Sequence, residues 1–161
     1  MSVVSAFQSP KHNHARCMQG AINTAADLCT QRGVRLTPLR QRVLELIWRG
    51  HEPVLAYDLL EQLRSEHRAA APPTVYRALD FLLEQGLIHR IQSLKAFVAC
   101  GDPTLSPHSS QFLICTQCNA IAELADREIG RLVARKATAS GFTVHNQTIE
   151  IRGLCPRCEQ A

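Results

Sequence analysis

Residues 72–100, PPTVYRALDFLLEQGLIHRIQSLKAFVAC, decide the fold of this chain. The two prolines predict the first turn of a helix, and Gly86 predicts its end. Apolar residues at helical spacing predict the buried face of this helix, namely Val75, Leu79, Leu82 and Leu83. Two short apolar segments then flank a polar turn at Ser93-Leu94, a pattern that indicates a two-stranded hairpin.

The segments upstream predict the helices that precede a recognition helix. A helical pattern runs from Met18 and ends at Gly33. A second helix begins after the cap residue Thr37, with Pro38 in its first position. Residues 56–67, AYDLLEQLRSEH, have the apolar spacing of a third helix. Short helices followed by a hairpin are the element order of a winged helix-turn-helix, a fold that binds DNA.

The recognition helix exposes polar residues from which contacts to DNA are expected. Thr74, Tyr76 and Arg77 lie in its N-terminal part, where such a helix contacts base edges. Arginine can pair with guanine through two hydrogen bonds, so Arg77 is the leading candidate. The alternative for Arg77 is an ordinary solvated surface charge. Tyr57, at the start of the preceding helix, is a further candidate for a phosphate or base contact.

The second half of the chain predicts a small metal-binding domain. Residues 101–109, GDPTLSPHS, are rich in turn formers and predict a hinge. A strand, a tight knuckle and a second strand are expected over residues 110–124, followed by a helix capped by Asp126. Residues 142–158, FTVHNQTIEIRGLCPRC, alternate weakly and predict one long strand with an irregularity at Asn146-Gln147.

The predicted fold class is α+β, with an N-terminal winged helix-turn-helix followed by a small α/β dimerisation domain that holds a four-cysteine zinc site. The last part has only about 50 residues, so metal and self-association would both help to stabilise it. The expected organisation is a flexible tail over residues 1–17, the DNA-binding domain over 18–100, the hinge over 101–109 and the dimerisation and metal-binding domain over 110–161.

Composition is compatible with a cytoplasmic nucleic-acid-binding protein. The chain has 161 residues, a formal net charge of +4 and a sequence pI near 8.8, a mild basic excess. No apolar run reaches the roughly 18 residues that a membrane span needs, and the N-terminus lacks the pattern of a signal peptide. Because thiols stay reduced in the cytoplasm, the seven cysteines need an explanation other than disulfides.

Four of the cysteines form two CxxC pairs, Cys115 with Cys118 and Cys155 with Cys158, separated by 36 residues. Each pair presents two thiolates on one side of a tight turn, and two such knuckles complete the tetrahedron that zinc prefers in structural sites. A thioredoxin-like redox protein needs one CxxC at a strand-to-helix turn and not two matched pairs. Unpaired core cysteines are the other alternative. The spacing favours a permanent structural zinc site.

A second metal site is expected from the candidates that remain, His89, Cys100, His108 and Glu123. With a two-residue turn in the hairpin, His89 lies opposite Val98 and diagonally from Cys100 on one face. Two imidazoles, a thiolate and a carboxylate suit tetrahedral zinc, although lone histidines and cysteines are more often structural. Two of these ligands come from the hairpin, called the wing below, one from the hinge and one from the domain over residues 110–161. One ion bound to all four would fix the two domains in one orientation, so it could act as a switch.

Three segments resemble the ferric uptake regulator family, in particular its zinc uptake regulator branch. They are RLTPLRQRVLELI at residues 35–47, AYDLLEQLR at 56–64 and PPTVYRALDFLLEQGLIHRI at 72–91, and the resemblance runs from about residue 20 to the end. It implies an N-terminal DNA-binding half, a C-terminal half that forms a homodimer, and a metal-dependent repressor. When zinc is plentiful, such a repressor binds AT-rich inverted repeats in the double-stranded DNA upstream of zinc-acquisition genes.

The resemblance also implies two Zn²⁺ ions per chain. By position, the structural zinc matches Cys115, Cys118, Cys155 and Cys158, and the regulatory zinc matches His89, Cys100, His108 and Glu123. The chain departs from the iron branch, because only His108 stands where iron regulators carry a His-His-Asp-His run. Gln147 also stands where that branch has a metal-binding histidine. Both departures argue against an iron or peroxide sensor.

Other functions remain as alternatives. The nearest is an iron- or peroxide-responsive regulator of the same fold, and the next is a zinc-ribbon scaffold whose metal is purely structural. A zinc enzyme or thiol oxidoreductase would need an open metal position with a general base, or a low-pKa CxxC, and neither pattern is found. The chain is therefore predicted not to be an enzyme and to have no membrane association and no small-molecule substrate. Cys29 is expected in the core, while Cys17, His12 and His14 are expected near a disordered tail.

Overall fold

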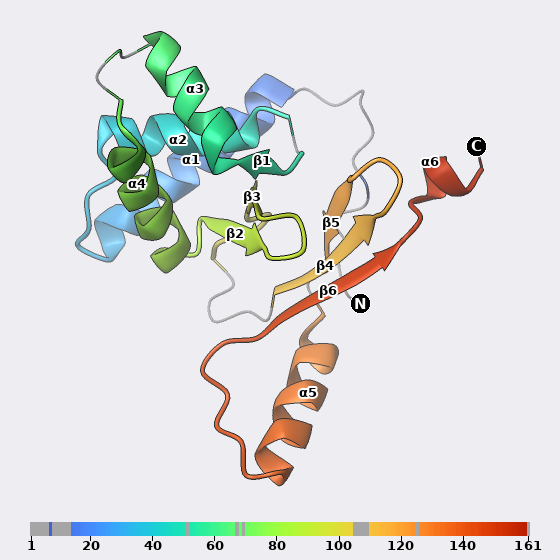
Figure 1. Ribbon diagram of the computed structural model, residues 1–161. Helices are drawn as coiled ribbons and strands as arrows, with labels where there is room; N and C mark the ends of the chain where they lie inside the picture. Colours follow the sequence, from blue (N-terminus) through green and yellow to red (C-terminus); the bar gives the residue numbers. More distant parts are fainter. Residues whose placement is uncertain are drawn as a thin grey trace. The chain divides into compact units, whose positions relative to one another are not determined.

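The computed structural model describes residues 7, 14–50, 52–66, 68, 70–104, 110–124 and 126–160. The chain divides after Thr104 into two compact units. The described residues from 14 to 104 are called the N-terminal unit here, and those from 110 to 160 the C-terminal unit (Figure 1). No helix among the described residues is long and apolar enough to cross a membrane.

The N-terminal unit has the helix and hairpin order of a winged helix-turn-helix, which confirms the predicted fold class. Its elements follow in chain order: α1 (His14–Gln31), α2 (Pro38–Trp48), β1 (Val54–Leu55), α3 (Ala56–Glu66), α4 (Pro72–Glu84), β2 (Ile88–Ile91) and β3 (Ala96–Ala99). The three strands form an antiparallel sheet in the order β1-β3-β2.

One boundary and one strand in this unit differ from the prediction. Helix α1 begins at His14 and not at Met18, so the last four residues of the predicted tail 1–17 are helical. Ala15 and Arg16 are exposed, so the first turn has no apolar periodicity from which its start could be inferred. Strand β1 was not predicted, because two residues are too short to show an alternating pattern.

The helices pack around an apolar core to which α4 contributes. Helix α2 begins as predicted, since the Thr37 hydroxyl accepts a hydrogen bond from the Arg40 amide at 3.4 Å. Helix α4 buries five residues, Val75, Ala78, Leu79, Phe81 and Leu82. Leu83, predicted on the buried face, is only half-buried. Phe81 instead completes that face, and the Arg40 guanidinium lies 3.7 Å from the centre of its ring.

The hairpin has the predicted register. His89 pairs with Val98, and Ile88 pairs with Ala99. The turn closes with a hydrogen bond from the Lys95 amide to the Gln92 carbonyl at 3.2 Å, with Ser93-Leu94 at its centre.

The C-terminal unit is a three-stranded mixed sheet with one long helix. Its elements are β4 (Ser110–Cys115), β5 (Ile121–Glu123), α5 (Arg127–Ala139), β6 (Thr148–Gly153) and the short α6 (Pro156–Glu159). The order is β5-β4-β6, with β5 antiparallel and β6 parallel to β4. Asp126 caps α5 as predicted, because its carboxylate accepts hydrogen bonds from the amides of Glu128 and Ile129.

The long strand predicted from Phe142 is wrong in its first half. Strand β6 begins only at Thr148, and residues 142–147 are irregular. The alternation in this segment does not reflect burial, since Phe142 is 64% exposed. Asn146 folds back on the backbone instead, and its side-chain oxygen accepts a hydrogen bond from the Gln147 amide at 2.8 Å.

The C-terminal unit leaves several large apolar residues uncovered in the single chain. They come from α5, β6 and the segments beside them: Leu132, Val133, Phe142, Ile151 and Leu154. Within α5 only Gly130 is buried. Apolar surface of this extent is typical of a protein that associates with a partner.

Candidate metal centre and nucleic-acid surface

The two CxxC knuckles meet because β4 and β6 are parallel neighbours. Cys115 ends β4 and lies in register with Gly153, the last residue of β6. The first knuckle therefore follows β4 at the same end of the sheet where the second follows β6 (Figure 1). Asn119 closes the first knuckle with a φ of 57°, a left-handed conformation that asparagine tolerates better than most residues.

The four sulfur atoms are spaced for one zinc ion. All four Sγ atoms lie within 4.8 Å of one another, and Cys118 Sγ lies 3.7 Å from Cys155 Sγ. Zinc–sulfur bonds of about 2.3 Å in a tetrahedron put neighbouring sulfurs about 3.8 Å apart. A disulfide would need about 2.05 Å. The cluster of Cys115, Cys118, Cys155 and Cys158, called the cysteine tetrad below, therefore fits a structural zinc ion.

Backbone amides stabilise thiolates in the tetrad. The amides of Cys118 and Cys155 lower the pKa of Cys115 to about 6, and the Cys155 amide lies 3.4 Å from Cys115 Sγ. The Ala120 amide lowers the pKa of Cys118. Hydrogen bonding with the Cys118 and Cys155 sulfurs raises the pKa of Cys158 to about 12. Zinc takes thiolates as ligands, so its binding at the tetrad releases the remaining protons.

Three of the tetrad thiols are at least partly buried. Cys115 is 1% and Cys155 is 2% exposed, Cys158 is intermediate, and Cys118 is exposed. Four protein sulfurs leave no coordination position for water or substrate, which is the arrangement of a structural site and not of a catalytic one.

One residue near the tetrad was not singled out from the sequence. Arg157 stands between the cysteines of the second pair, and its Nη2 atom lies 3.9 Å from Cys118 Sγ. This contact raises the pKa of Arg157. The only signal in the sequence was a cation inside the CxxC motif, which does not reveal the sulfur that it contacts.

The wing of the N-terminal unit brings His89 and Cys100 together. A ring nitrogen of His89 and Cys100 Sγ lie within 4.8 Å of each other, as the register of the hairpin predicts. Cys100 is 1% exposed, and its amide donates to the Leu87 carbonyl at 3.0 Å. A neutral imidazole and a thiolate are both good zinc ligands. The pair can therefore supply two of the four ligands that a second zinc ion needs.

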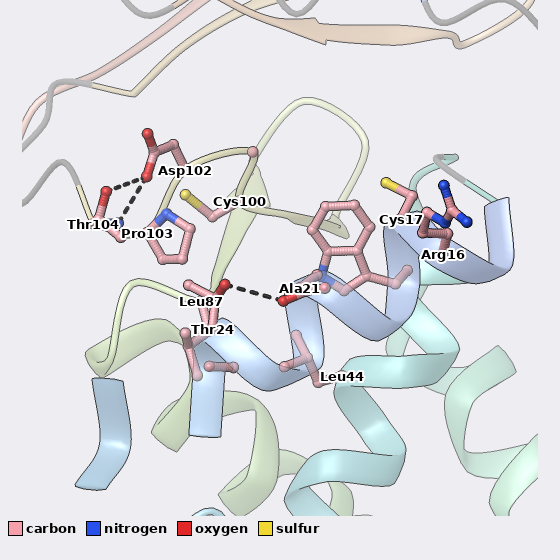
Figure 2. Close-up of a pocket in the computed structure, with 14 residues that line it drawn as sticks. Arg16, Cys17, Ala21, Thr24, Leu44, Leu87, Cys100, Asp102, Pro103 and Thr104 are labelled. Carbon is pink, nitrogen blue, oxygen red and sulfur yellow. Dashed lines mark hydrogen bonds between the residues drawn. The ribbon is translucent and has the colours of Figure 1, made fainter. Parts of the chain in front are cut away.

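Cys100 also lines a cavity of about 370 Å³ within the same unit. Figure 2 shows Cys100 with Asp102, Pro103 and Thr104 on one side of this cavity and Cys17 on the other. The Asp102 carboxylate accepts a hydrogen bond from the Thr104 amide at 3.0 Å, so the start of the predicted hinge is an ordered turn. Two small residues of α1, Gly20 and Ala21, also line the cavity.

The other two residues predicted for the second site belong to other segments of the chain. Glu123 ends β5 in the C-terminal unit, is half-buried and pairs with Phe112. His108 lies outside the described residues. The union of His89, Cys100, His108 and Glu123 in one site stays a prediction.

The residues predicted to contact DNA lie on the surface of the N-terminal unit. On α4, Thr74 and Arg77 are exposed and Tyr76 is 54% exposed. Tyr57 in the first turn of α3 is 63% exposed, and hydrogen bonding to Glu61 raises the pKa of its phenol. The first turn of α4 contains no acidic residue. Its positive end is thus suited to approach phosphate groups.

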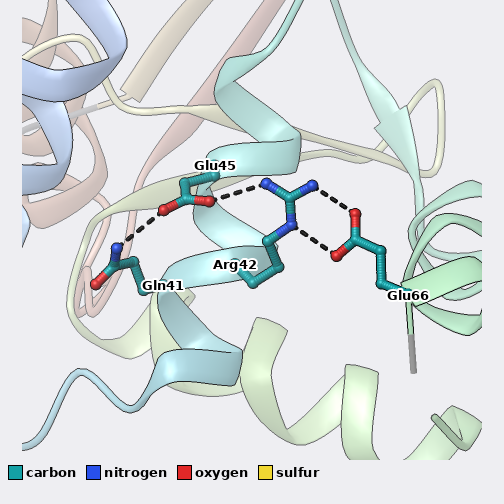
Figure 3. Close-up of polar contacts among 4 residues, drawn as sticks. All are labelled: Gln41, Arg42, Glu45 and Glu66. Atoms are coloured by element: carbon teal, nitrogen blue, oxygen red, sulfur yellow. Dashed lines mark hydrogen bonds and ion pairs between the residues drawn. The ribbon is translucent and has the colours of Figure 1, made fainter.

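An ion-pair network at the surface joins α2 to the end of α3 (Figure 3). Arg42 donates from Nε to Glu66 at 2.8 Å and from Nη1 to Glu45 at 2.9 Å, and its Nη2 also contacts Glu66. Gln41 donates to the other oxygen of Glu45 at 2.9 Å. A two-pronged contact of arginine with a carboxylate is directional. The network therefore helps to set the angle between the two helices.

Comparisons with known proteins agree with this architecture. A model of the ferric uptake regulator family matches residues 31–152. The zinc uptake regulation protein of Escherichia coli (strain K12) is 41% identical over 140 residues, which cover 87% of this chain and 82% of that protein. A solved zinc uptake regulator complexed with zinc and DNA is 40% identical, with a TM-score of 0.85 over 89% of this chain and 95% of that one.

A further relative has been solved in two forms. Holo XcZur is 45% identical, with a TM-score of 0.83 over 88% of this chain and 99% of that one. Apo XcZur, 43% identical over 89% and 99% of the two chains, has a TM-score of only 0.53. At nearly equal identity, this chain therefore matches the holo form of XcZur better than the apo form.

Proposed function

Because the chain belongs to the ferric uptake regulator family, we propose that it is a zinc-responsive transcriptional repressor. It binds operator DNA as a dimer when zinc is bound, and it controls genes for zinc uptake and homeostasis. Relatives at 40% to 45% identity support this function, since they are zinc uptake regulators and one is complexed with zinc and DNA. As a DNA-binding regulator, and not an enzyme, it acts in the cytoplasm.

One observation carries the proposal. The wing of the DNA-binding unit holds a nitrogen and a sulfur ligand, from His89 and Cys100, within 4.8 Å of each other. A single ion bound by this pair would be coordinated by residues in and directly after the hairpin β2–β3, which follows the recognition helix α4. Metal occupancy can thereby influence how the DNA-binding unit is held.

Two zinc ions per chain have different roles. The cysteine tetrad holds the first permanently. This ion stabilises the C-terminal unit, because the free energy of zinc binding adds to the free energy of folding. His89 and Cys100 of the wing, His108 of the hinge and Glu123 of β5 hold the second. An ion bound there would link these four side chains, which are ligand types that zinc prefers.

The regulatory ligands act by restricting orientation. When zinc is absent, the four ligands are not joined through a common ion, and the two recognition helices of a dimer seldom match successive major grooves. With zinc, the two recognition helices are held at one separation. This matters because they must match the fixed spacing of the two operator half-sites. The better match of this chain to holo than to apo XcZur is in keeping with such a change. A bias of about 3 kcal/mol toward the competent orientation shifts DNA affinity about a hundredfold.

The dimer forms through the C-terminal unit. Its uncovered apolar residues, Leu132, Val133, Phe142, Ile151 and Leu154, provide the surface that a second copy would bury. A two-fold dimer presents two α4 helices, which matches an AT-rich inverted-repeat operator.

Replacing Arg77 with alanine is expected to weaken operator binding without changing the metal content. If Arg77 pairs with a base, the loss is about 1–3 kcal/mol per half-site. The measurement is operator affinity in saturating zinc, together with zinc per chain. Arg77→Lys separates two roles, because lysine keeps the charge but loses the two-pronged geometry. Near wild-type affinity in the lysine variant would mean a phosphate contact, and unchanged affinity in the alanine variant would remove Arg77 from the interface.

The proposed function is tested by operator binding across a buffered zinc series, with metal stoichiometry measured on the same samples. Two zinc ions per chain are expected, and only the more readily chelated one should track DNA affinity. A parallel Fe²⁺ series separates a zinc sensor from an iron-responsive regulator of the same fold. If zinc has no effect on operator affinity and the chain holds one ion, the metal is purely structural and the regulatory role is wrong.

A further inference from the structure

Arg157 lies against the one exposed sulfur of the cysteine tetrad. Its Nη2 atom is 3.9 Å from Cys118 Sγ. Cys118 is the exposed member of the four, whereas Cys115 and Cys155 are buried. The guanidinium therefore lies beside the thiolate that chelators, oxidants and electrophiles in solution can reach most easily.

The short helix α6 determines where this guanidinium lies. Cys155 precedes the helix, and its carbonyl accepts hydrogen bonds from the amides of Cys158 at 3.0 Å and Glu159 at 2.9 Å. Pro156 occupies the first helical position, where its fixed φ suits the turn. The turn that positions the second pair of ligands thus also positions Arg157.

The charge of the tetrad gives this contact a consequence. Four thiolates outweigh the charge of one zinc ion, so the occupied site carries a net negative charge. A guanidinium that donates to a sulfur offsets part of this charge and withdraws electron density from that sulfur. A thiolate with less electron density is a weaker nucleophile. The contact also opposes movement of the exposed sulfur away from the other three, because that movement would break a charge-assisted interaction.

We propose that Arg157 is a positioning residue that slows exchange of the structural zinc ion by holding the exposed Cys118 thiolate in the site. This inference rests on the proposed function in one respect, that the tetrad holds zinc. The contact of Arg157 makes the structural ion exchange more slowly than the regulatory ion. The structural ion stays in place while the regulatory ion exchanges with the zinc available in the cell.

The test measures two rates in wild type and in each variant, starting from the zinc-loaded full chain. One is the rate of zinc release to a chromogenic chelator, and the other is the rate of Cys118 alkylation by iodoacetamide, followed by mass spectrometry. In Arg157→Ala, release of the slow ion and modification of Cys118 are both expected to become about 3- to 10-fold faster. This is less than a buried ligand partner would give, because water and salt screen an exposed contact. Added salt should reduce the difference between the variant and wild type. Arg157→Lys, which keeps the charge, should lie between the two.

Arg152→Ala is the matched control, since Arg152 is an exposed arginine on β6 of the same unit, paired in the sheet with Ile114. Wild-type rates are expected for it, and equal acceleration in both alanine variants would overturn a specific role for Arg157. Unchanged rates in Arg157→Ala would also overturn it. Zinc content of wild type is measured first, because wild type without a slowly released ion would instead overturn the structural zinc site. Circular dichroism confirms that each variant is folded.

Discussion

Replacing Cys100 with serine is expected to abolish zinc-dependent operator binding while the protein stays a folded dimer with zinc in its tetrad. Serine nearly keeps the size of the side chain, but its hydroxyl stays protonated near neutral pH and does not replace a thiolate as a zinc ligand. The hydrogen bond from the Cys100 amide to Leu87 is made by the backbone and is retained. Affinity in saturating zinc should fall to the zinc-free level, about a hundredfold lower.

Operator affinity with and without zinc, the number of zinc ions per chain and the oligomeric state are measured on the same preparation. Cys17→Ser is the matched control, because Cys17 lines the same cavity as Cys100 but lies on α1. It should bind the operator as wild type does. If Cys100→Ser still responds to zinc with wild-type amplitude, the regulatory site assigned to the wing is wrong.

Replacing Cys155 with serine is expected to have the largest effect on structure. Cys155 is 2% exposed, lies 3.7 Å from Cys118 Sγ and donates its amide to Cys115. Losing one of four thiolates sharply weakens zinc binding, and the C-terminal unit depends on zinc for folding energy. Loss of one zinc ion per chain and of the dimer is expected. The N-terminal unit has its own apolar core, so it should keep its helical signal.

The comparison uses zinc stoichiometry, analytical ultracentrifugation and thermal unfolding. Cys29→Ala removes another buried thiol, in α1 of the N-terminal unit, and should keep both zinc and dimer at a modest cost in stability. A Cys155→Ser protein that retains two zinc ions and the dimer would show that the tetrad does not stabilise the C-terminal unit.

The elements that were predicted correctly have strong local signals. Thr37 and Pro38 start α2, and Asp126 caps α5, because side-chain oxygens and proline satisfy the needs of a helix end within one turn. The register of the hairpin follows from its short turn, which leaves one choice of partner for His89.

The errors lie where the local signal is weak. Residues 142–147 alternate in hydropathy without being strand, because Phe142 is exposed in the single chain and does not contribute to its core. The first turn of α1 is exposed at Ala15 and Arg16, so no periodicity marks its start at His14. Strand β1 exists only because Val54 and Leu55 pair with β3, a contact across more than forty residues.

The sequence by itself determined which residues can bind zinc and how each small group is arranged. Two CxxC pairs form knuckles through backbone amides a few residues away, and His89 reaches Cys100 through a tight turn, so both arrangements are local. The two CxxC pairs predict one shared site, but only the tertiary structure decided how the knuckles converge, because this depends on β6 lying parallel to β4. It also decided that Arg157 contacts Cys118, 39 residues away. The spacing of Arg157 and Cys118 carries no sign that they meet, because this contact follows from sheet pairing and packing.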